Sequence, residues 1–176
     1  PNENITVDWQ VADDEAMTKV VAHGTTVATP ELAHSVHVEV SGLQPGRWYF
    51  YQFHGAGADS PKGRVRTAPK ASDLPERLRF AFASCQHWES GLYTAYQHMT
   101  QESLDLIAHL GDYIYEQAGK ADRVRMHVGP TLRELEDYRN RHAQYKTDKF
   151  LQAAHAMCPW IVTWDDHEVA NNYAGS

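Results

Sequence analysis

The chain has 176 residues, of which 42% are hydrophobic and 22% are charged, a composition typical of a folded globular protein with one domain or two small ones. The formal net charge is −7 and no run of five or more basic residues occurs, which argues against general nucleic-acid binding. No apolar stretch approaches the ~20 residues of a membrane-spanning helix, so no transmembrane segment is expected.

Residues 1–67 alternate polar and apolar residues in short runs that are separated by turn signals. Period-2 alternation with frequent Gly and Pro is typical of strands in a small antiparallel β-sandwich. The expected strands are Ile5–Trp9, the stretch around Lys19–Val21, Val36–Val40, Tyr49–Phe53 and Arg64–Thr67. We therefore predict a β-sandwich domain over residues 1–67.

The stretch from Val36 to Phe53 places a Leu-x-Pro-Gly turn between two strand-like runs. Leu43, Pro45 and Tyr49 match the corner positions of fibronectin type III and immunoglobulin-like domains, which this stretch resembles. The resemblance implies that Tyr49 is a structural anchor, and we expect the domain to lack its first strand or strands. It carries no information about activity.

Residues 68–77 are polar and contain proline, and we predict that they form a linker. From residue 78 onward, apolar strands alternate with helical spacing, which favours parallel strands joined by crossover helices. The expected strands are Leu78–Ala83, Leu104–Leu110 and Trp160–Trp164, and the expected helices are 91–101, Leu135–Tyr145 and 149–157. Residues 78–176 are therefore predicted to belong to an α/β domain.

Each of the three predicted parallel strands is followed by a polar cluster. The clusters are Ser84–His87, Gly111–Glu116 and Asp165–Glu168. Ligands gather beyond the carboxyl ends of parallel strands, so three such clusters together indicate a site. Carboxylates and a phenolate in the G-D-x-x-Y spacing suit a hard metal ion, and four polar residues straight after an apolar strand need water or metal.

Each cluster alone also allows a structural interpretation. A turn Asp with a packed Tyr would explain G-D-x-x-Y, and D-D-H-E could be a solvated loop. His167 could be a metal ligand, a proton donor or a hydrogen-bonded structural residue, because its ordinary pKa lies near neutrality.

The two cysteines, Cys85 and Cys158, could form one disulfide but no zinc site of the CxxC type. A lone buried cysteine is usually a small core residue, and Cys158 is assigned to the core. Cys85 follows a predicted strand and precedes polar residues. It is therefore a candidate metal ligand or, in a different class of hydrolase, a nucleophile with His87 or His167 as its base.

Four strings in the second half closely resemble the PhoD-type alkaline phosphatases. They are F-A-S-C-Q, H-L-G-D-Y-I-Y-E, D-Y-R-N-R-H-A-Q-Y and T-W-D-D-H-E-V-x-N-N. The G-D-x-x-Y and D-H-E pair also looks like the calcineurin-like metallophosphoesterase signature. The likeness implies that residues 78–176 are the N-terminal half of an α/β metallophosphatase domain, preceded by the β-sandwich domain of that family.

The resemblance also implies cofactors and residue roles. Ferric iron would be bound by Cys85, Asp112 and Tyr115, and calcium would be the other metal. Asp166 would bind the second metal site, and His167 would contact the phosphoryl group and assist the leaving group. Family members are usually exported, so the resemblance implies a secreted, periplasmic or cell-wall-associated protein.

Four further residues are candidates for substrate contact or for orienting ligands. Arg can bind phosphate oxygens in a forked geometry, although a solvated helix face would explain the arginines equally well. Polar neighbours of a ligand can also orient it. The candidates are Arg139, Arg141, Asp165 and Asn171.

The expected function is hydrolysis of small-molecule phosphate mono- or diesters by a metal-activated water. A binding protein that keeps the fold without the chemistry, and the Cys-His hydrolase, are the alternatives. The chain begins at Pro1 without an initiator Met and ends just after a dense polar motif. We therefore expect a fragment that is inactive alone, and its lack of a signal segment says nothing about export.

Overall fold

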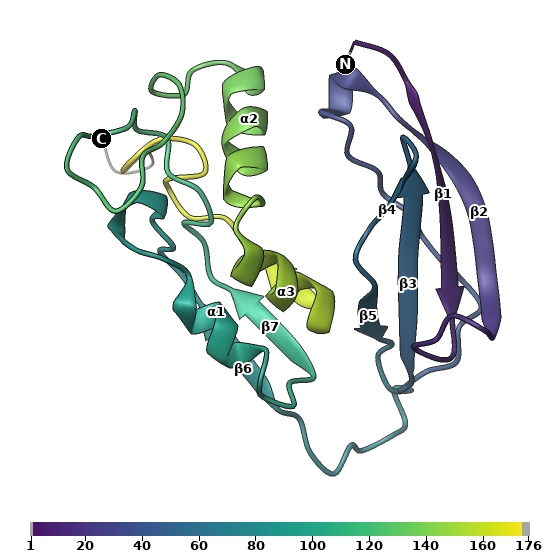
Figure 1. Cartoon of the computed structure of the whole chain (residues 1–176). Helices are drawn as coiled ribbons and strands as arrows, with labels where there is room; N and C mark the ends of the chain where they lie inside the picture. Colours follow the sequence, from purple (N-terminus) through teal and green to yellow (C-terminus); the bar gives the residue numbers. More distant parts are fainter. Residues whose placement is uncertain (1, 174–176) are drawn as a thin grey trace. The chain divides into compact units, whose positions relative to one another are not determined.

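The computed structural model describes residues 2–173, which divide into two compact units (Figure 1). The first unit comprises the residues up to Leu78 together with Ala156–Pro159, and the second comprises Arg79–His155 and the residues from Trp160 onward. Residues 67–79 contain neither helix nor strand. Within the described part of the chain, the helices are too short or too polar to cross a membrane.

The first unit is built on an antiparallel sheet. Its strands are β1 (Ile5–Ala12), β2 (Val20–Ala28), β3 (Trp48–Gly55), β4 (Ala58–Asp59) and β5 (Gly63–Arg66). The order is β2-β1-β3-β4, and β5 also pairs with β3. A short 3-10 helix, η1 (Pro30–Leu32), follows β2. Ala56 and Gly57 both have positive φ angles between β3 and β4, as a two-residue hairpin turn requires.

The predicted strand Val36–Val40 is wrong, because this segment pairs with no other strand among the described residues. Its burial still alternates, and Val38 and Val40 line a cavity of about 490 Å³ with Val11 and Phe53. The alternation therefore identified which side chains are turned inward, but a strand also needs a backbone partner.

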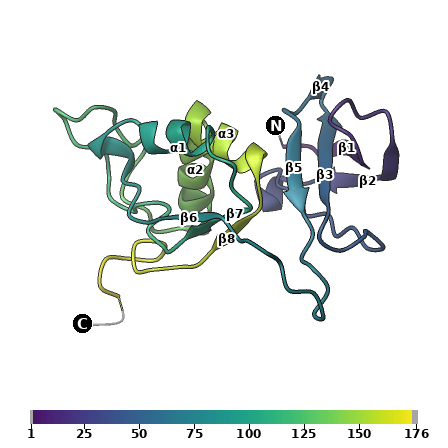
Figure 2. The ribbon, with the colours of Figure 1, turned by 90° about the horizontal axis from the view of Figure 1, so that it is seen from below.

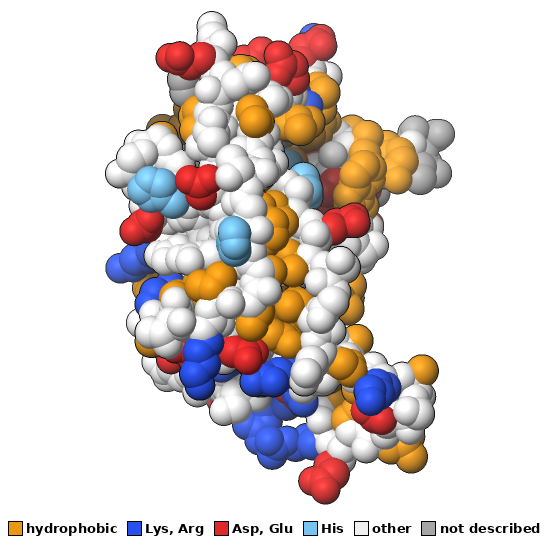
Figure 3. Space-filling view, turned by 90° about the vertical axis from the view of Figure 1, so that its right-hand side faces the viewer, with side chains coloured by type: hydrophobic (Ala, Val, Ile, Leu, Met, Phe, Trp, Pro, Cys, Tyr) orange, Lys and Arg blue, Asp and Glu red, His pale blue; other side chains and the backbone are white. Residues whose placement is uncertain are grey.

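On one face of the molecule, hydrophobic side chains form a band bordered by polar ones (Figure 3).

Tyr49 anchors the corner before β3, as predicted. Its side chain is 3% exposed, and its hydroxyl oxygen accepts a 2.9 Å hydrogen bond from the Gln44 amide. The bond reaches back five residues, which is the arrangement of a tyrosine corner. The aromatic ring thus fills the core while its polar end is satisfied by the backbone.

The second unit contains a parallel sheet and helices. Its strands, in the spatial order β6-β7-β8, are β6 (Phe80–Ala83), β7 (Leu106–His109) and β8 (Trp160–Val162). Its helices are η2 (Trp88–Ser90), α1 (Thr94–Met99), α2 (Leu135–Tyr145) and α3 (Lys149–Met157). The predicted parallel strands and crossover helices are confirmed, and α2 and α3 have the predicted bounds.

The helices cover one face of the parallel sheet (Figure 2). Ile107 is fully buried on this covered face. Phe82 and Ile161 are aligned with Ala108, the residue after Ile107 in β7, so they lie on the opposite face of the sheet. They are 67% and 63% exposed. All three strands run the same way, so their carboxyl ends meet at one edge of the sheet, where the polar clusters follow.

Candidate metal centre

Backbone hydrogen bonds bring the loops after β6, β7 and β8 together. The Cys85 amide donates to Gly111 O over 3.2 Å, and the Gln86 amide donates to Asp112 O over 3.1 Å. The Thr163 amide donates to His109 O over 3.0 Å. The parallel pairing thus continues past the strands, and the three predicted polar clusters become neighbours.

Two predicted ligands lie at positions where the backbone is left-handed. The φ angles of Cys85 and Asp112 are 55° and 54°, values that non-glycine residues rarely adopt. Gly111 precedes Asp112 with φ 103°, and a Cβ atom there would lie 2.5 Å from Asp165 Cβ and 2.7 Å from Asp165 N. Only glycine therefore allows the loop after β8 to approach the loop after β7 so closely.

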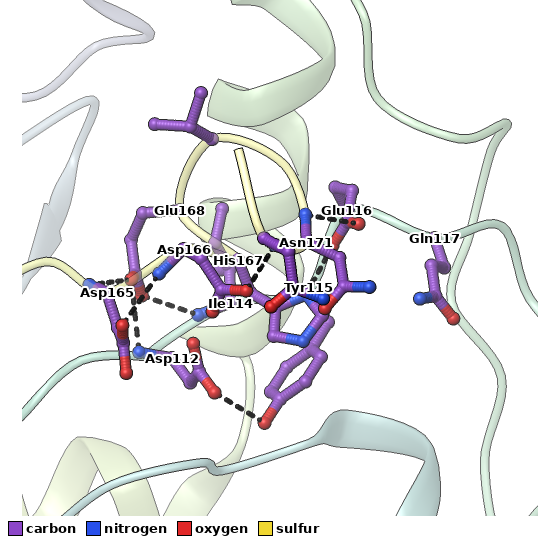
Figure 4. A network of polar contacts seen from close by, with 12 residues as sticks. Asp112, Ile114, Tyr115, Glu116, Gln117, Asp165, Asp166, His167, Glu168 and Asn171 are labelled. Carbon is purple, nitrogen blue, oxygen red and sulfur yellow. Dashed lines mark hydrogen bonds and ion pairs between the residues drawn. The ribbon is translucent and has the colours of Figure 1, made fainter. Parts of the chain in front are cut away.

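Asp112, Asp166 and His167 place potential ligand atoms within 4.8 Å of one another (Figure 4). Asp112 is 6% exposed, and its Oδ2 accepts a 3.0 Å hydrogen bond from the Tyr115 hydroxyl. Its Oδ1 is buried without a hydrogen-bond partner. A buried carboxylate oxygen that lacks a donor fits a cation, because leaving it unpaired is costly.

Tyr115 lies beside both Asp112 and Cys85. Burial, the hydrogen bond to Asp112, the charges of Asp112 and Cys85 and a hydrogen bond with Cys85 all raise the pKa of Tyr115. The phenol therefore stays protonated unless a cation joins these residues, because a metal inverts the local electrostatic balance. The Tyr115 ring centroid also lies 4.3 Å from that of His87 and 4.1 Å from that of His167.

His167 is held by a buried glutamate. Its Nδ1 lies 2.7 Å from Glu116 Oε2, and Glu116 Oε1 accepts a 3.1 Å hydrogen bond from the Asn171 amide. Partial burial alone lowers the pKa of His167, but the hydrogen bond to Glu116 and the charges of Glu116, Asp112 and Asp166 raise it overall. Burial likewise opposes ionisation of Glu116, but His167 and backbone amides lower its pKa.

The loop after β8 is organised by side-chain contacts to its own backbone. Asp165 Oδ1 accepts from the Asp166 amide over 3.0 Å, and Asp166 Oδ2 accepts from the Asn172 amide over 2.5 Å. The bond from Asn172 is the main cause that lowers the pKa of Asp166. Glu168 accepts from the Asp165 amide and from amides of the loop after β7. Asp165 and Asn171 thus shape the loop that carries Asp166 and His167.

The two predicted arginines lie elsewhere. Arg141 is 2% exposed, and its guanidinium donates to the carbonyl oxygens of Tyr115, Gln117 and Pro130. This contradicts a phosphate contact, because the buried fork is used to hold the loop between β7 and α2. Arg139 is half-buried on α2, and the described residues offer it no hydrogen bond or ion pair.

Neither cysteine forms a disulfide. Cys158 is buried, as predicted, and Cys85 is exposed. Within residues 2–173, no hydrogen bond links Cys85 to a histidine, and His87 Nδ1 accepts from the Glu89 amide over 3.2 Å. A Cys-His nucleophile therefore gains no support from the geometry. Cys85 has a hydrogen bond with Tyr115, but among the described residues it does not join the close group of Asp112, Asp166 and His167.

Glu116 and Glu168 were not among the predicted site residues. Each is an acidic residue in a polar cluster that follows a strand, which was the available signal. Their partners are His167 and backbone amides that lie more than 50 residues away in the sequence. Local spacing cannot identify such partners, so their roles emerge only from the fold.

The donor set fits the two kinds of metal that the sequence resemblance implies. A thiolate and a phenolate beside Asp112 suit ferric iron, and the oxygens of Asp112 and Asp166 suit calcium. The unpaired Asp112 Oδ1 independently favours a cation at this position. The three adjacent donors, Asp112, Asp166 and His167, are fewer than calcium requires, since it takes roughly 6–8 oxygens.

Comparisons with known proteins agree along the whole chain. The profile described as PhoD-like phosphatase matches residues 80–176, and that of the PhoD-like phosphatase N-terminal domain matches residues 1–69. Alkaline phosphatase D of Bacillus subtilis (strain 168) is 52% identical over 99% of this chain and 31% of its own. A solved structure titled "Structure of PhoD" superposes with a TM-score of 0.93 at 52% identity.

That solved structure aligns with 98% of this chain, which covers 34% of its length. The sequence thus spans about a third of the relatives that it matches. One profile alone covers more than half of the 176 residues, and the second covers most of the remainder. The chain belongs to the PhoD-like phosphatase family.

Proposed function

We propose that the full-length protein, meaning this chain extended to the length of its relatives, hydrolyses phosphate mono- or diesters with a metal-activated water. The buried and unpaired Oδ1 of Asp112, within 4.8 Å of donors from Asp166 and His167, is the observation that carries the proposal. The family and the 52% identity to an alkaline phosphatase D support the same reaction class.

Ferric iron would be held by Cys85, Asp112 and Tyr115, and calcium by carboxylates that include Asp112 and Asp166. Bound metals would lower the pKa of a water and neutralise charge on the phosphoryl group. The left-handed backbone at Cys85 and Asp112 supports this assignment, because strained conformations persist where the surrounding structure enforces them.

His167 would deliver a proton to the leaving oxygen. Its Nδ1 is engaged by Glu116, so Nε2 is the nitrogen that remains for substrate. The hydrogen bond from His167 to Glu116 is the main cause that raises the pKa of His167, and it favours the protonated ring that a proton donor requires. Export to a secreted, periplasmic or cell-wall location stays a prediction from the family resemblance.

The test uses purified full-length protein and nitrophenyl phosphate mono- and diesters. We expect chelation to abolish hydrolysis and iron with calcium to restore it. Asp112→Asn should lower activity at least roughly 10–100-fold, which is the loss that follows when residues around a metal's ligands are mutated. It should also remove the rise in unfolding temperature on adding metal. Asp73→Asn, at an exposed position of the stretch 67–79 that contains neither helix nor strand, is the control.

Metal-independent hydrolysis that thiol alkylation abolishes would instead support the Cys-His alternative. Metal binding without hydrolysis of any ester would support a binding protein that keeps the fold. Either result would refute the proposed reaction. The first would show ester cleavage that needs no metal, and the second would show bound metal that does not cleave esters.

A further inference from the structure

The Glu168 carboxylate lies between the two loops that carry the candidate ligands (Figure 4). Its Oε2 accepts from the Asp112 amide over 3.0 Å and from the Asp165 amide over 2.7 Å. Its Oε1 accepts from the Tyr113 amide and, over 3.4 Å, from the Ile114 amide. One side chain therefore binds four backbone N–H groups, three after β7 and one after β8.

The three amides after β7 need such an acceptor because their segment has left the sheet. Gly111 and Asp112 both have positive φ angles, which turn the next amides toward Glu168 instead of toward a neighbouring strand. Amides that converge in this way form a concave site for an anion. Hydrogen bonds from amides to a carboxylate are stronger than those between neutral groups.

We propose that Glu168 is a positioning residue that sets the geometry of the metal centre without binding the metal itself. Both of its oxygens are occupied by backbone amides, whereas Asp112 Oδ1 is free of hydrogen bonds. Oε2 joins the Asp112 amide to the Asp165 amide, and Asp165 precedes Asp166 directly. Glu168 thus sets the spacing between Asp112 and Asp166. The inference rests on the proposed function.

Two substitutions separate charge from reach. In Glu168→Gln the side chain keeps its length, but its NH₂ group cannot accept hydrogen bonds, so one pair of amides loses its acceptor in either orientation. Glu168→Asp keeps the charge and both acceptors but is shorter by one CH₂. It should therefore hold the four amides partly, less well than the parent protein does. Glu102→Gln, at an exposed position of the same unit, is the matched control.

The first measurement is amide hydrogen exchange in metal-free full-length protein. We expect Glu168→Gln to speed exchange by at least about tenfold in one of the two pairs, either at Asp112 and Asp165 or at Tyr113 and Ile114, while β7 and α2 keep the protection of the parent protein. Glu168→Asp should lie between the parent and Glu168→Gln. This measurement needs no catalytic activity, so it tests the contacts even where the proposed function fails.

The second measurement is iron binding, followed through affinity and the visible absorption of an iron-bound Tyr115 phenolate. We expect Glu168→Gln to weaken iron binding about 10–100-fold, the range for residues that orient ligands. Excess metal should restore its absorption band and part of its hydrolysis. The same excess should not rescue Asp112→Asn, which lacks a carboxylate ligand.

Unchanged exchange and iron affinity in Glu168→Gln would overturn the inference. Loss of protection throughout the unit in both variants would also overturn it, because Glu168 would then support the fold in general. A parent protein that neither binds metal nor cleaves esters would refute the proposed function, and the exchange data would still decide whether Glu168 holds the loops.

Discussion

The pairing of His167 with Glu116 joins residues from two different loops through one hydrogen bond. Glu116 is buried and His167 nearly so, and their 2.7 Å contact replaces the water that each would otherwise bind. A histidine held at Nδ1 has a fixed ring orientation, which matters when Nε2 must face a substrate. The pair therefore controls both the direction and the protonation of the ring.

This pair predicts a specific pH dependence in metal-free full-length protein. The pKa of His167 is raised on folding, so its stabilising contribution is complete below the ordinary pKa of about 6.5 and disappears as pH rises through the folded value. Glu116→Gln should therefore lower the unfolding free energy near pH 6 by about 1.5–3 kcal/mol, the range for charged hydrogen bonds, and less near pH 9.

Unfolding free energies at the two pH values, with histidine-selective NMR titration of His167, would test this. The pKa of His167 should fall in Glu116→Gln and remain unchanged in the control Glu102→Gln. An equal loss of stability at both pH values would contradict a contribution from the charged pair.

At the scale of elements, the turn after β7 determines whether the loops can meet. Gly111 combines a positive φ angle with a close approach of the Asp165 backbone. Gly129 also has a positive φ angle, 89°, but a Cβ there would meet no atom within 4 Å. The two glycines therefore differ in crowding but share a positive φ angle within one unit.

Gly111→Ala should destabilise the second unit more than Gly129→Ala does. Both substitutions incur the strain of a left-handed alanine, about 1–2 kcal/mol. Only Gly111→Ala also forces Asp165 away, which should add about 1–3 kcal/mol, as overpacking does. Denaturant unfolding would measure the difference, and iron affinity should fall only in Gly111→Ala. Equal losses from the two variants would show that the close approach is unimportant.

The elements that could be predicted from sequence are those whose pattern is local. Helical spacing identified α2 and α3, and the polar clusters after β7 and β8 identified the neighbours Asp112, Asp166 and His167. Val36–Val40 could not be predicted correctly, because alternation shows which face is buried and not whether a partner strand exists. The predicted phosphate contact of Arg141 failed because helical spacing does not reveal which distant carbonyls a guanidinium will meet.

At the scale of the whole molecule, these residues would supply only part of the proposed metal centre. The chain covers 31% and 34% of the two relatives, and its candidate ligands are Cys85, Asp112, Tyr115 and Asp166, with His167 as a reacting group. The exposed Phe82 and Ile161 leave an apolar face on the parallel sheet. Exposed apolar faces of this kind favour association.

Residues 1–176 alone should therefore not hydrolyse nitrophenyl phosphate esters above a control that contains only the metals. Calcium takes roughly 6–8 oxygen ligands, more than the candidate residues offer. Phosphate release by the isolated chain and the full-length protein, compared at equal concentration and metal content, would test this. Equal rates would show that the residues described here form a sufficient site.

The contact between Glu168 and the Asp112 amide also bears on the order in which the chain folds. The two residues are 56 positions apart, and parallel strands meet only after the crossover segments between them have been gathered. Closing such segments costs chain entropy before any distant bond offsets it, so contacts of this span form slowly. During synthesis, β6 and β7 leave the ribosome well before Glu168 does. The loops that would hold metal therefore acquire their shape late, after the strands beneath them are in place.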